Sequence, residues 1–224
     1  IEFTGEVCEG MTLSGRMTMT NMSAEIGAKF AFFVPDEKVK KYLKGRTNET
    51  FATIQPDEDA FYEQVYDEDA SHLEPQVALP FSVDNVKPIS AVGPIKIDQA
   101  VVGSCTNGRL EDLRIAAEVM EGKKVHPDVR MLIIPASAEV YREAMGKGIL
   151  SQLSESGAIL CNPGCGPCMG GHMGLLASGE VCISSTNRNF KGRMGSPESE
   201  LYLASPATVA ASAVTGRITD PRKI

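Results

Sequence analysis

The stretch from Ile97 to Gly122, "IDQAVVGSCTNGRLEDLRIAAEVMEG", carries the transition that decides the fold. Its first eight residues, "IDQAVVGS", are mainly apolar or small and predict a buried strand. The segment "RLEDLRIAAEVMEG" predicts a helix with one apolar face. The residues of that face are Leu110, Leu113, Ala117 and Met120. A strand that leads through a short loop into a helix is the first part of a strand–helix–strand unit.

The same alternation continues to the end of the chain. Further apolar stretches predict strands at "VRMLIIP" (129–135), "GAILCNP" (157–163) and "EVCISS" (180–185). Ser137 is the predicted N-cap of a helix after the first of these strands. In the closing segment, Ser205 caps a helix, Pro206 takes its first position and Gly216 ends it. Strands that alternate with helices predict an α/β fold, with a parallel sheet covered on both faces.

The first part of the chain has a different character. Its Met- and Ala-rich start predicts one helix from about Ser14 to Phe33 and a second from Asp36 to Gly45. Residues 47–95 are acidic, interrupted by prolines and irregular, which indicates a connecting region. We therefore expect a boundary near Lys87 to Pro94. Residues 1–90 would be the end of a preceding domain, and residues 91–224 would form a second domain.

Composition and charge exclude several classes of protein. The 224 residues carry a net charge of −7, so nucleic acid is a poor candidate for the main partner. No run approaches the roughly 20 apolar residues that a membrane span needs. No signal peptide opens the chain, so we expect a cytoplasmic protein whose six cysteines are thiols or ligands rather than disulfides. The first residue is Ile rather than Met, which indicates a processed or partial chain.

Three of the cysteines lie in loops that follow predicted strands. Cys105 comes after the strand that ends at Gly103, and "NPGCGPCMGG" (162–171) places Cys165 and Cys168 after the strand ending near Cys161. The carboxyl ends of parallel strands meet at one edge of a sheet, where ligands bind. We therefore expect three thiols from two loops to converge.

Several chemistries could use this set of thiols. A thioredoxin-type centre needs its first thiol at a helix N-terminus, but "MGGHMG" after the pair is a poor start for a helix. Zinc would accept Cys105, Cys165, Cys168 and His172, although Cys105 has no second cysteine close in sequence. A purely structural role is the third interpretation, and it suits Cys8, Cys161 and Cys182 better.

An iron–sulfur cluster would use thiolates at Cys105, Cys165 and Cys168. Only three cysteines are well placed, so a four-iron cube would keep one iron with open coordination positions. An open iron can act as a Lewis acid on a hydroxyl or a carboxylate. This interpretation turns the missing fourth ligand into a possible mechanism.

Three blocks of the sequence resemble the signature blocks of the aconitase superfamily and occur in the family's order. They are "VVGSCTNGRLEDL" (101–113), "NPGCGPCMGG" (162–171) and "STNRNFKGRMGSPESELYLASP" (185–206). Two further matches, "RMTMTNMSAEIGAK" (16–29) and "VDNVKP" (83–88), resemble the large subunit of the isopropylmalate and homoaconitate branch. The resemblance covers essentially the whole chain.

The resemblance implies a fold, a cofactor and a set of site residues. The fold would be a three-layer α/β/α iron–sulfur domain with a mostly parallel sheet, preceded by part of another α/β domain. The cofactor would be a [4Fe-4S] cluster held by Cys105, Cys165 and Cys168, with Asn187 and Asn21 beside it. Catalysis and binding of the substrate carboxylates would involve Arg188, Arg193 and Glu25.

The implied reaction is that of a hydro-lyase. It would isomerise 2-isopropylmalate to 3-isopropylmalate by dehydration and rehydration, a step of leucine biosynthesis. A homoaconitase of a lysine or coenzyme B pathway, acting on another small hydroxy acid, is the alternative within the family. Outside it, a non-catalytic module that binds a cluster or a metal stays open.

The resemblance also implies that part of the machinery lies elsewhere. Family large subunits are about twice this length, so the chain resembles a C-terminal half. In this branch a small subunit carries a mobile domain with the serine that acts as base, in a heterodimer or heterotetramer. We expect the chain to be inactive alone.

Overall fold

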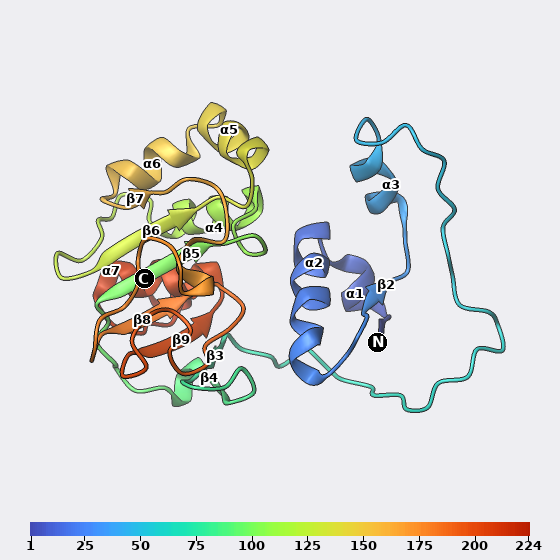
Figure 1. The fold of residues 1–224 in the computed structure, drawn as a ribbon, viewed down its shortest axis with the longest axis horizontal. Coiled ribbons are helices and arrows are strands. Elements are labelled where there is room, and N and C mark those ends of the chain that lie inside the picture. Colours follow the sequence, from blue (N-terminus) through green and yellow to red (C-terminus); the bar gives the residue numbers. More distant parts are fainter. The chain divides into compact units, whose positions relative to one another are not determined.

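A seven-stranded mixed sheet is the centre of the larger of two units into which the chain divides (Figure 1). The computed structural model describes residues 1–224, with units at Ile1–Leu73 and Glu74–Ile224. The strand order is β4-β3-β9-β8-β5-β6-β7. The bounds are β3 (Gln76–Ala78), β4 (Val86–Pro88), β5 (Gln99–Gly103), β6 (Arg130–Ile134), β7 (Ile159–Leu160), β8 (Val181–Ser184) and β9 (Glu200–Ala204). Strands β5 to β9 are parallel to their neighbours among themselves, whereas β3 and β4 are antiparallel additions, so the predicted α/β class with a mostly parallel sheet is confirmed.

Alternation along the strands divides the core between the two faces of the sheet. Val102 pairs with Ile133, and both contribute to the larger cluster of buried apolar residues. Their neighbours Val101 and Leu132 belong to a second cluster on the opposite face. The central strand β5 is buried at every position, as expected for a parallel strand covered on both sides.

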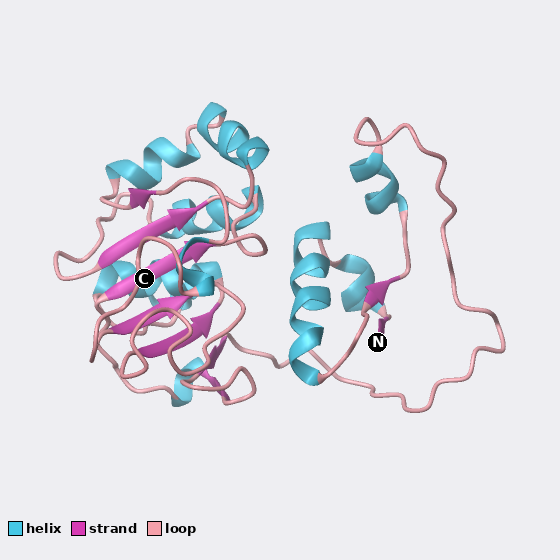
Figure 2. Cartoon of the chain, viewed as in Figure 1, coloured by secondary structure: helices cyan, strands magenta, loops and turns pink.

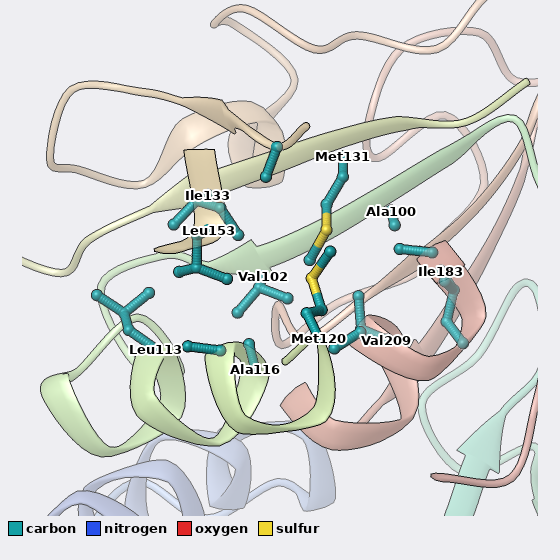
Figure 3. Packing of buried hydrophobic residues seen from close by; sticks show 14 of the residues in the cluster. Ala100, Val102, Leu113, Ala116, Met120, Met131, Ile133, Leu153, Ile183 and Val209 are labelled. Carbon is teal, nitrogen blue, oxygen red and sulfur yellow. The ribbon is translucent and has the colours of Figure 1, made fainter. Parts of the chain in front are cut away.

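Four helices cover the face of the larger cluster. They are α4 (Leu110–Val119), α5 (Ala138–Gly146), α6 (Ile149–Glu155) and α7 (Pro206–Thr215), and they contact one another as well as the strands. Figure 3 shows Leu113, Ala116 and Met120 directed toward the sheet residues Val102, Met131 and Ile133. The predicted apolar face of α4 is confirmed, with Leu113, Ala117 and Met120 almost fully buried.

The opposite face has no comparable layer of helices. The second cluster joins the strand residues to Leu176 and Met194, which lie in the long loops after β7 and β8. The short 3-10 turn η3 (Gly166–Met169) is the helical piece within these loops. This arrangement differs from the predicted three-layer α/β/α fold because apolar side chains from the loops, not a helix, remove this face from water.

The predicted helix ends are confirmed where capping residues define them. The hydroxyls of Ser137 and Ser205 accept hydrogen bonds from the backbone N–H groups of Val140 and Thr208. Gly216 ends α7 with a φ of 73°, a left-handed conformation that glycine adopts without strain. Four other elements, α6, β9, β3 and β4, were not predicted. Two further 3-10 turns complete this unit, η2 (Ile89–Ala91) and η4 (Pro221–Lys223).

The predicted domain boundary and the division of the structure fall at different places. Both β3 and β4 lie before or within the expected boundary near Lys87 to Pro94, yet β3 pairs with β9 of the main sheet. The two compact units divide instead between Leu73 and Glu74.

The smaller unit contains short elements. They are β1 (Glu2–Phe3), α1 (Glu6–Gly10), α2 (Leu13–Met22), the 3-10 turn η1 (Ser23–Ile26), β2 (Phe32–Phe33) and α3 (Glu37–Leu43). The helix predicted up to Phe33 is therefore wrong beyond Met22. Gly27, with a φ of 84°, ends the helical region, and Phe32 and Phe33 pair in parallel with β1. The predicted start of the second helix is confirmed, because Asp36 caps α3.

The segment between α3 and β3 contains no helix or strand (Figure 2), as its acidic, proline-interrupted sequence predicted. None of the helices combines the length and the apolar character that crossing a membrane requires.

Candidate functional site

The candidate site lies at the carboxyl edge of the sheet, at the point where the order of the strands reverses. From the central strand β5 the chain passes through α4 to β6 on one side, whereas β8 lies on the other side of β5 and leads on to β9. Open α/β sheets bind their ligands at such switch points, beyond the carboxyl ends of the strands. The loops after β5, β7 and β8 carry the residues that the sequence singled out.

The loop after β5 is fixed to the end of β6. The N–H of Ser104 donates to the carbonyl oxygen of Ile134 at 3.1 Å, and the N–H of Ala136 donates to that of Gly108 at 2.8 Å. A Cβ atom on Gly103 would lie 2.0 Å from the Ile134 oxygen, and one on Gly108 would lie 2.3 Å from it. Only glycine lets the loop approach the neighbouring strand this closely.

The loop with the other two cysteines depends on the same strand end. The N–H of Gly164 donates to the carbonyl oxygen of Pro135 at 3.1 Å. Gly166 has a φ of 58°, and a Cβ there would lie 2.1 Å from Cδ1 of Ile134. One side chain of β6 therefore fills the space beside η3, which carries the buried Cys168. Strand β6 contributes no cysteine, yet it holds both cysteine loops.

The thiols of the two loops come together. Ser104 has a φ of 107°, which is uncommon for a residue with a side chain, and the following Cys105 is exposed. The neighbouring Cys105 thiol raises the pKa of Cys165, mainly through charge repulsion. Partial burial and the nearby Cys168 act in the same direction, whereas the guanidinium of Arg193 opposes them. The structure thus brings Cys105, Cys165, Cys168 and Arg193 into one neighbourhood.

The remaining cysteines fit the structural interpretation. All six cysteines are free in the structure. Cys161 and Cys182 are buried in apolar surroundings, and burial raises the pKa of each thiol. Cys8 is half-buried in the smaller unit. His172 is exposed, and no group of three or more His, Cys, Asp or Glu side chains, the loop cysteines included, is placed to hold a metal ion as the structure stands.

Asn187 reaches the Cys105 loop from the loop after β8. Its side chain is buried, and its Oδ1 accepts a 2.7 Å hydrogen bond from the hydroxyl of Thr106. Beside it, Nδ2 of Asn107 donates to the carbonyl oxygen of Ser185 at 2.6 Å. These contacts join Asn187 to the Cys105 loop, and its predicted place beside a cluster stays a prediction. Asn107 thus joins two loops.

The two predicted arginines lie farther along this third loop and are half-buried. The Nε atom of Arg193 is buried without a hydrogen-bond partner, close to the Cys165 thiol. Its segment is tied to the cysteine loop by hydrogen bonds of Leu176, whose N–H donates to Met194 O at 2.8 Å and whose carbonyl oxygen accepts from Ser196 N–H at 2.9 Å. An unpartnered guanidinium donor beside thiols fits an anionic ligand.

Sequence reasoning missed Asn189, which anchors this loop by hydrogen bonds to a neighbouring turn. Its side chain is fully buried, and Nδ2 donates to the carbonyl oxygens of Leu79 at 2.7 Å and Ser82 at 3.2 Å. These bonds connect the third loop to the turn between β3 and β4. A signal was present, because an asparagine between Arg188 and Phe190 in a polar loop is a candidate for backbone bridging.

Asn21 and Glu25 belong to the smaller unit. Asn21 lies on α2 and Glu25 on η1, and both are half-buried. The two residues were expected on one face of a continuous helix, but α2 ends at Met22. Their predicted approach to the cysteines stays a prediction.

The sequence matches the profile of the aconitase family (aconitate hydratase) over residues 1–95 and 91–216. A protein of Methanopyrus kandleri named 3-isopropylmalate dehydratase large subunit 1 is 57% identical over 222 residues, covering 99% of this chain and 53% of the relative. A protein of Pyrococcus furiosus with the same name is 55% identical over 226 residues, covering 100% of this chain and 53% of the relative. A probable methanogen homoaconitase large subunit of Methanothermobacter thermautotrophicus is 52% identical over 223 residues, covering 100% and 52%. The chain spans about half the length of these curated relatives, and it belongs to the aconitase family.

Proposed function

We propose that the chain is part of the large subunit of a hydro-lyase of the 3-isopropylmalate dehydratase type. It would contribute to isomerising 2-isopropylmalate to 3-isopropylmalate by dehydration and rehydration, in leucine biosynthesis in the cytoplasm. The observation that carries the proposal is the meeting of Cys105 and Cys165, with Cys168 beside them, at the switch point of the sheet.

The donor chemistry of Cys105, Cys165 and Cys168 suits a [4Fe-4S] cluster, which would draw the three thiols together as ligands. Thiolates are the ligands that such clusters use, and cysteines from two loops supply them here. Arg193 places a positive charge and an unpartnered Nε atom beside the thiols. Such a charge favours the deprotonated form that metal binding requires. When bound, the cluster would supply a Lewis-acidic iron for the hydroxyl and a carboxylate of the substrate.

The protein's own residues would bind and orient the acid. Arg188 and Arg193 present planar guanidinium groups, which bind carboxylates through two parallel hydrogen bonds. Asn187 would lie against the cluster from the loop after β8, where its buried amide is held. Asn21 and Glu25 would reach the same place from the smaller unit, as the family's motif implies.

The proposal also includes a partner subunit and two candidate substrates. The relatives from Methanopyrus and Pyrococcus are named large subunits. We infer a separate small subunit with a mobile domain, in a heterodimer or heterotetramer. A homoaconitase is the second candidate, because the Methanothermobacter relative is nearly as similar. The acid-binding residues would serve either substrate.

Anaerobic reconstitution of the chain with iron and sulfide tests the cluster. We expect about four iron and four labile sulfide ions per chain, and their loss in Cys105→Ala, Cys165→Ala and Cys168→Ala. The matched control is Cys8→Ala, a half-buried cysteine of the smaller unit, which should load normally. Zinc uptake without labile sulfide, or full loading of all three variants, would contradict the proposal.

A further inference from the structure

Two neighbouring parallel strands end in nearly the same sequence. "SCTN" (Ser104–Asn107) follows β5, and "SSTN" (Ser184–Asn187) begins at the last residue of β8. In both, the serine hydroxyl faces the N–H of the threonine two residues later, at 3.5 Å in the first and 3.1 Å in the second. The neighbouring strands β5 and β8 thus end in two similar turns, which lie at the switch point of the sheet.

Side chains connect the two turns. Besides the bond from Thr106 to Asn187, the N–H of Gly103 donates to the hydroxyl of Ser185 at 2.9 Å. Thr106 is 6% exposed and Asn187 is 3% exposed, so water does not compete for their hydrogen bond. The residue after Cys105 is therefore joined to the third loop by a buried hydrogen bond.

The bond fixes which way the amide of Asn187 points. A threonine hydroxyl that donates to Oδ1 leaves Nδ2 facing another direction, because oxygen and nitrogen diverge from the same carbon. The hydroxyls of Ser104 and Thr106 lie 3.4 Å apart. The Ser104 oxygen accepts from the N–H of Thr106, so the Ser104 hydroxyl can donate to the Thr106 oxygen. The Thr106 hydroxyl is then left to donate to Asn187.

We propose that Thr106 is a positioning residue that orients the amide of Asn187, so that Nδ2 donates toward the group held by Cys105, Cys165 and Cys168. This inference rests on the proposed function, because it assumes a cluster at these thiols. An N–H donor beside a cluster sulfur raises the reduction potential and slows loss of the cluster. Thr106 would act through Asn187 and would touch neither cluster nor substrate.

Thr106→Val tests the inference, because valine keeps the shape of threonine and removes the hydroxyl. Thr106→Ser keeps the hydroxyl and is the conservative rescue. The matched control is Thr208→Val, since Thr208 is also fully buried, but its hydroxyl pairs with Ser205 at the start of α7. Two measurements on the full chain apply: the side-chain amide NMR signals of Asn187 without iron, and the reduction potential and air stability of the reconstituted cluster.

We expect one ordered pair of Asn187 amide signals in the wild type and in Thr106→Ser, and shifted or averaged signals in Thr106→Val. After reconstitution, Thr106→Val should have a lower reduction potential and lose its cluster about tenfold faster in air. Thr208→Val should match the wild type in both measurements.

Other outcomes separate the two proposals. Unchanged Asn187 signals in Thr106→Val, or a Thr106→Ser variant that behaves like Thr106→Val, would overturn the positioning role. Changed signals with an unchanged potential would overturn its effect on the cluster. A wild-type chain that takes up no iron and sulfide would count against the proposed function, while the amide signals would still decide whether Thr106 orients Asn187.

Discussion

The carbonyl oxygen of Ile134 lies 2.0 Å from the point where a side chain on Gly103 would begin, and 2.3 Å from the same point on Gly108. The loop with Cys105 thus packs backbone against backbone on the end of β6. No flexible side chain lies between them that could move aside. Substitution of either glycine must displace the loop or the strand.

Gly108→Ala should destabilise the protein, because the new Cβ would also lie 2.6 Å from the carbonyl oxygen of Ser104. Overpacking of this kind costs about 1–3 kcal/mol of unfolding free energy, measurable by urea denaturation. Gly146→Ala is the control, since nothing lies within 4 Å of a Cβ there, at the end of α5. That variant should gain up to about 1 kcal/mol. Equal stability of the two variants would contradict the packing argument.

Asp220 should make the larger unit lose stability as the pH falls below about 3.8. Hydrogen bonds from the Arg222 guanidinium, at 2.9 and 2.6 Å, lower the pKa of Asp220 to about 2 from an ordinary 3.8. Because the folded-state pKa is lowered, the stabilisation is present above about pH 3.8 and is lost as the pH falls toward 2. Asp220→Asn should therefore flatten the fall of the melting temperature over this range. Asp128→Asn, an exposed aspartate, is the control and should keep the wild-type slope.

Asp112 should have the opposite pH dependence. Burial near the start of α4 raises the pKa of Asp112 to about 6, although its carboxylate accepts a 2.9 Å bond from the N–H of Arg109. A raised folded-state pKa means that stability is highest at low pH and declines as the pH rises from about 4 to about 6. Asp112→Asn keeps an acceptor and removes the charge. Above pH 6 it should be more stable than the wild type by about 1 kcal/mol, since partial exposure limits the effect. A less stable variant at pH 7 would show that the charge supports the helix.

Arg193 should control the reactivity of the thiol pair. Its positive charge opposes the rise in the pKa of Cys165. Arg193→Met should therefore raise that pKa further and slow alkylation by iodoacetamide at pH 8, because the thiolate is the reactive form. Peptide mapping by mass spectrometry would report the rate at Cys165. Lys191→Met, an exposed lysine of the same loop, should leave that rate unchanged. Equal rates in the two variants would remove the electrostatic role.

The chain alone should not turn over 2-isopropylmalate, even with a full cluster. It spans about half the length of its curated relatives, and the proposed base belongs to a partner. NMR of the substrate mixture would detect any conversion to 3-isopropylmalate. Addition of a small subunit and the remaining part of a large subunit should restore it. Turnover by the chain alone would show that a base lies within these residues.

The sequence was sufficient for elements with a strong local signal. The apolar run of β5, the one-sided pattern of α4, and the caps at Ser137 and Ser205 appear in the structure as predicted. Each depends on neighbouring residues and a fixed period, so composition and spacing were enough.

Elements that depend on distant partners could not be read in this way. Strands β3 and β4 have three residues each, and β3 is extended because it pairs with Leu203 and Ala204 of β9. The helix expected to reach Phe33 stops at Met22, since Phe32 and Phe33 pair with the chain start. Alternation of strands and helices predicted a covered sheet, but could not show that Leu176 and Met194 would cover one face in place of a helix.

The candidate site also has features that the local sequence shows and features that it does not. Cysteines at strand ends were visible in the sequence, because the positions of strands fix the positions of the following loops. The hydrogen bond from Thr106 to Asn187 joins residues that are far apart in the chain. No local pattern contains that information, so only the folded structure could supply it.

Because β6 lies between the strands that lead to Cys105 and Cys165, the metal site and the fold share one order of assembly. The thiols can meet only after β6 has formed between β5 and β7, and after Ile134 and Pro135 have accepted hydrogen bonds from the two cysteine loops. An incompletely folded chain would offer scattered cysteines, each open to oxidation or to the wrong metal. The three thiols therefore come together only when the sheet and its core have formed.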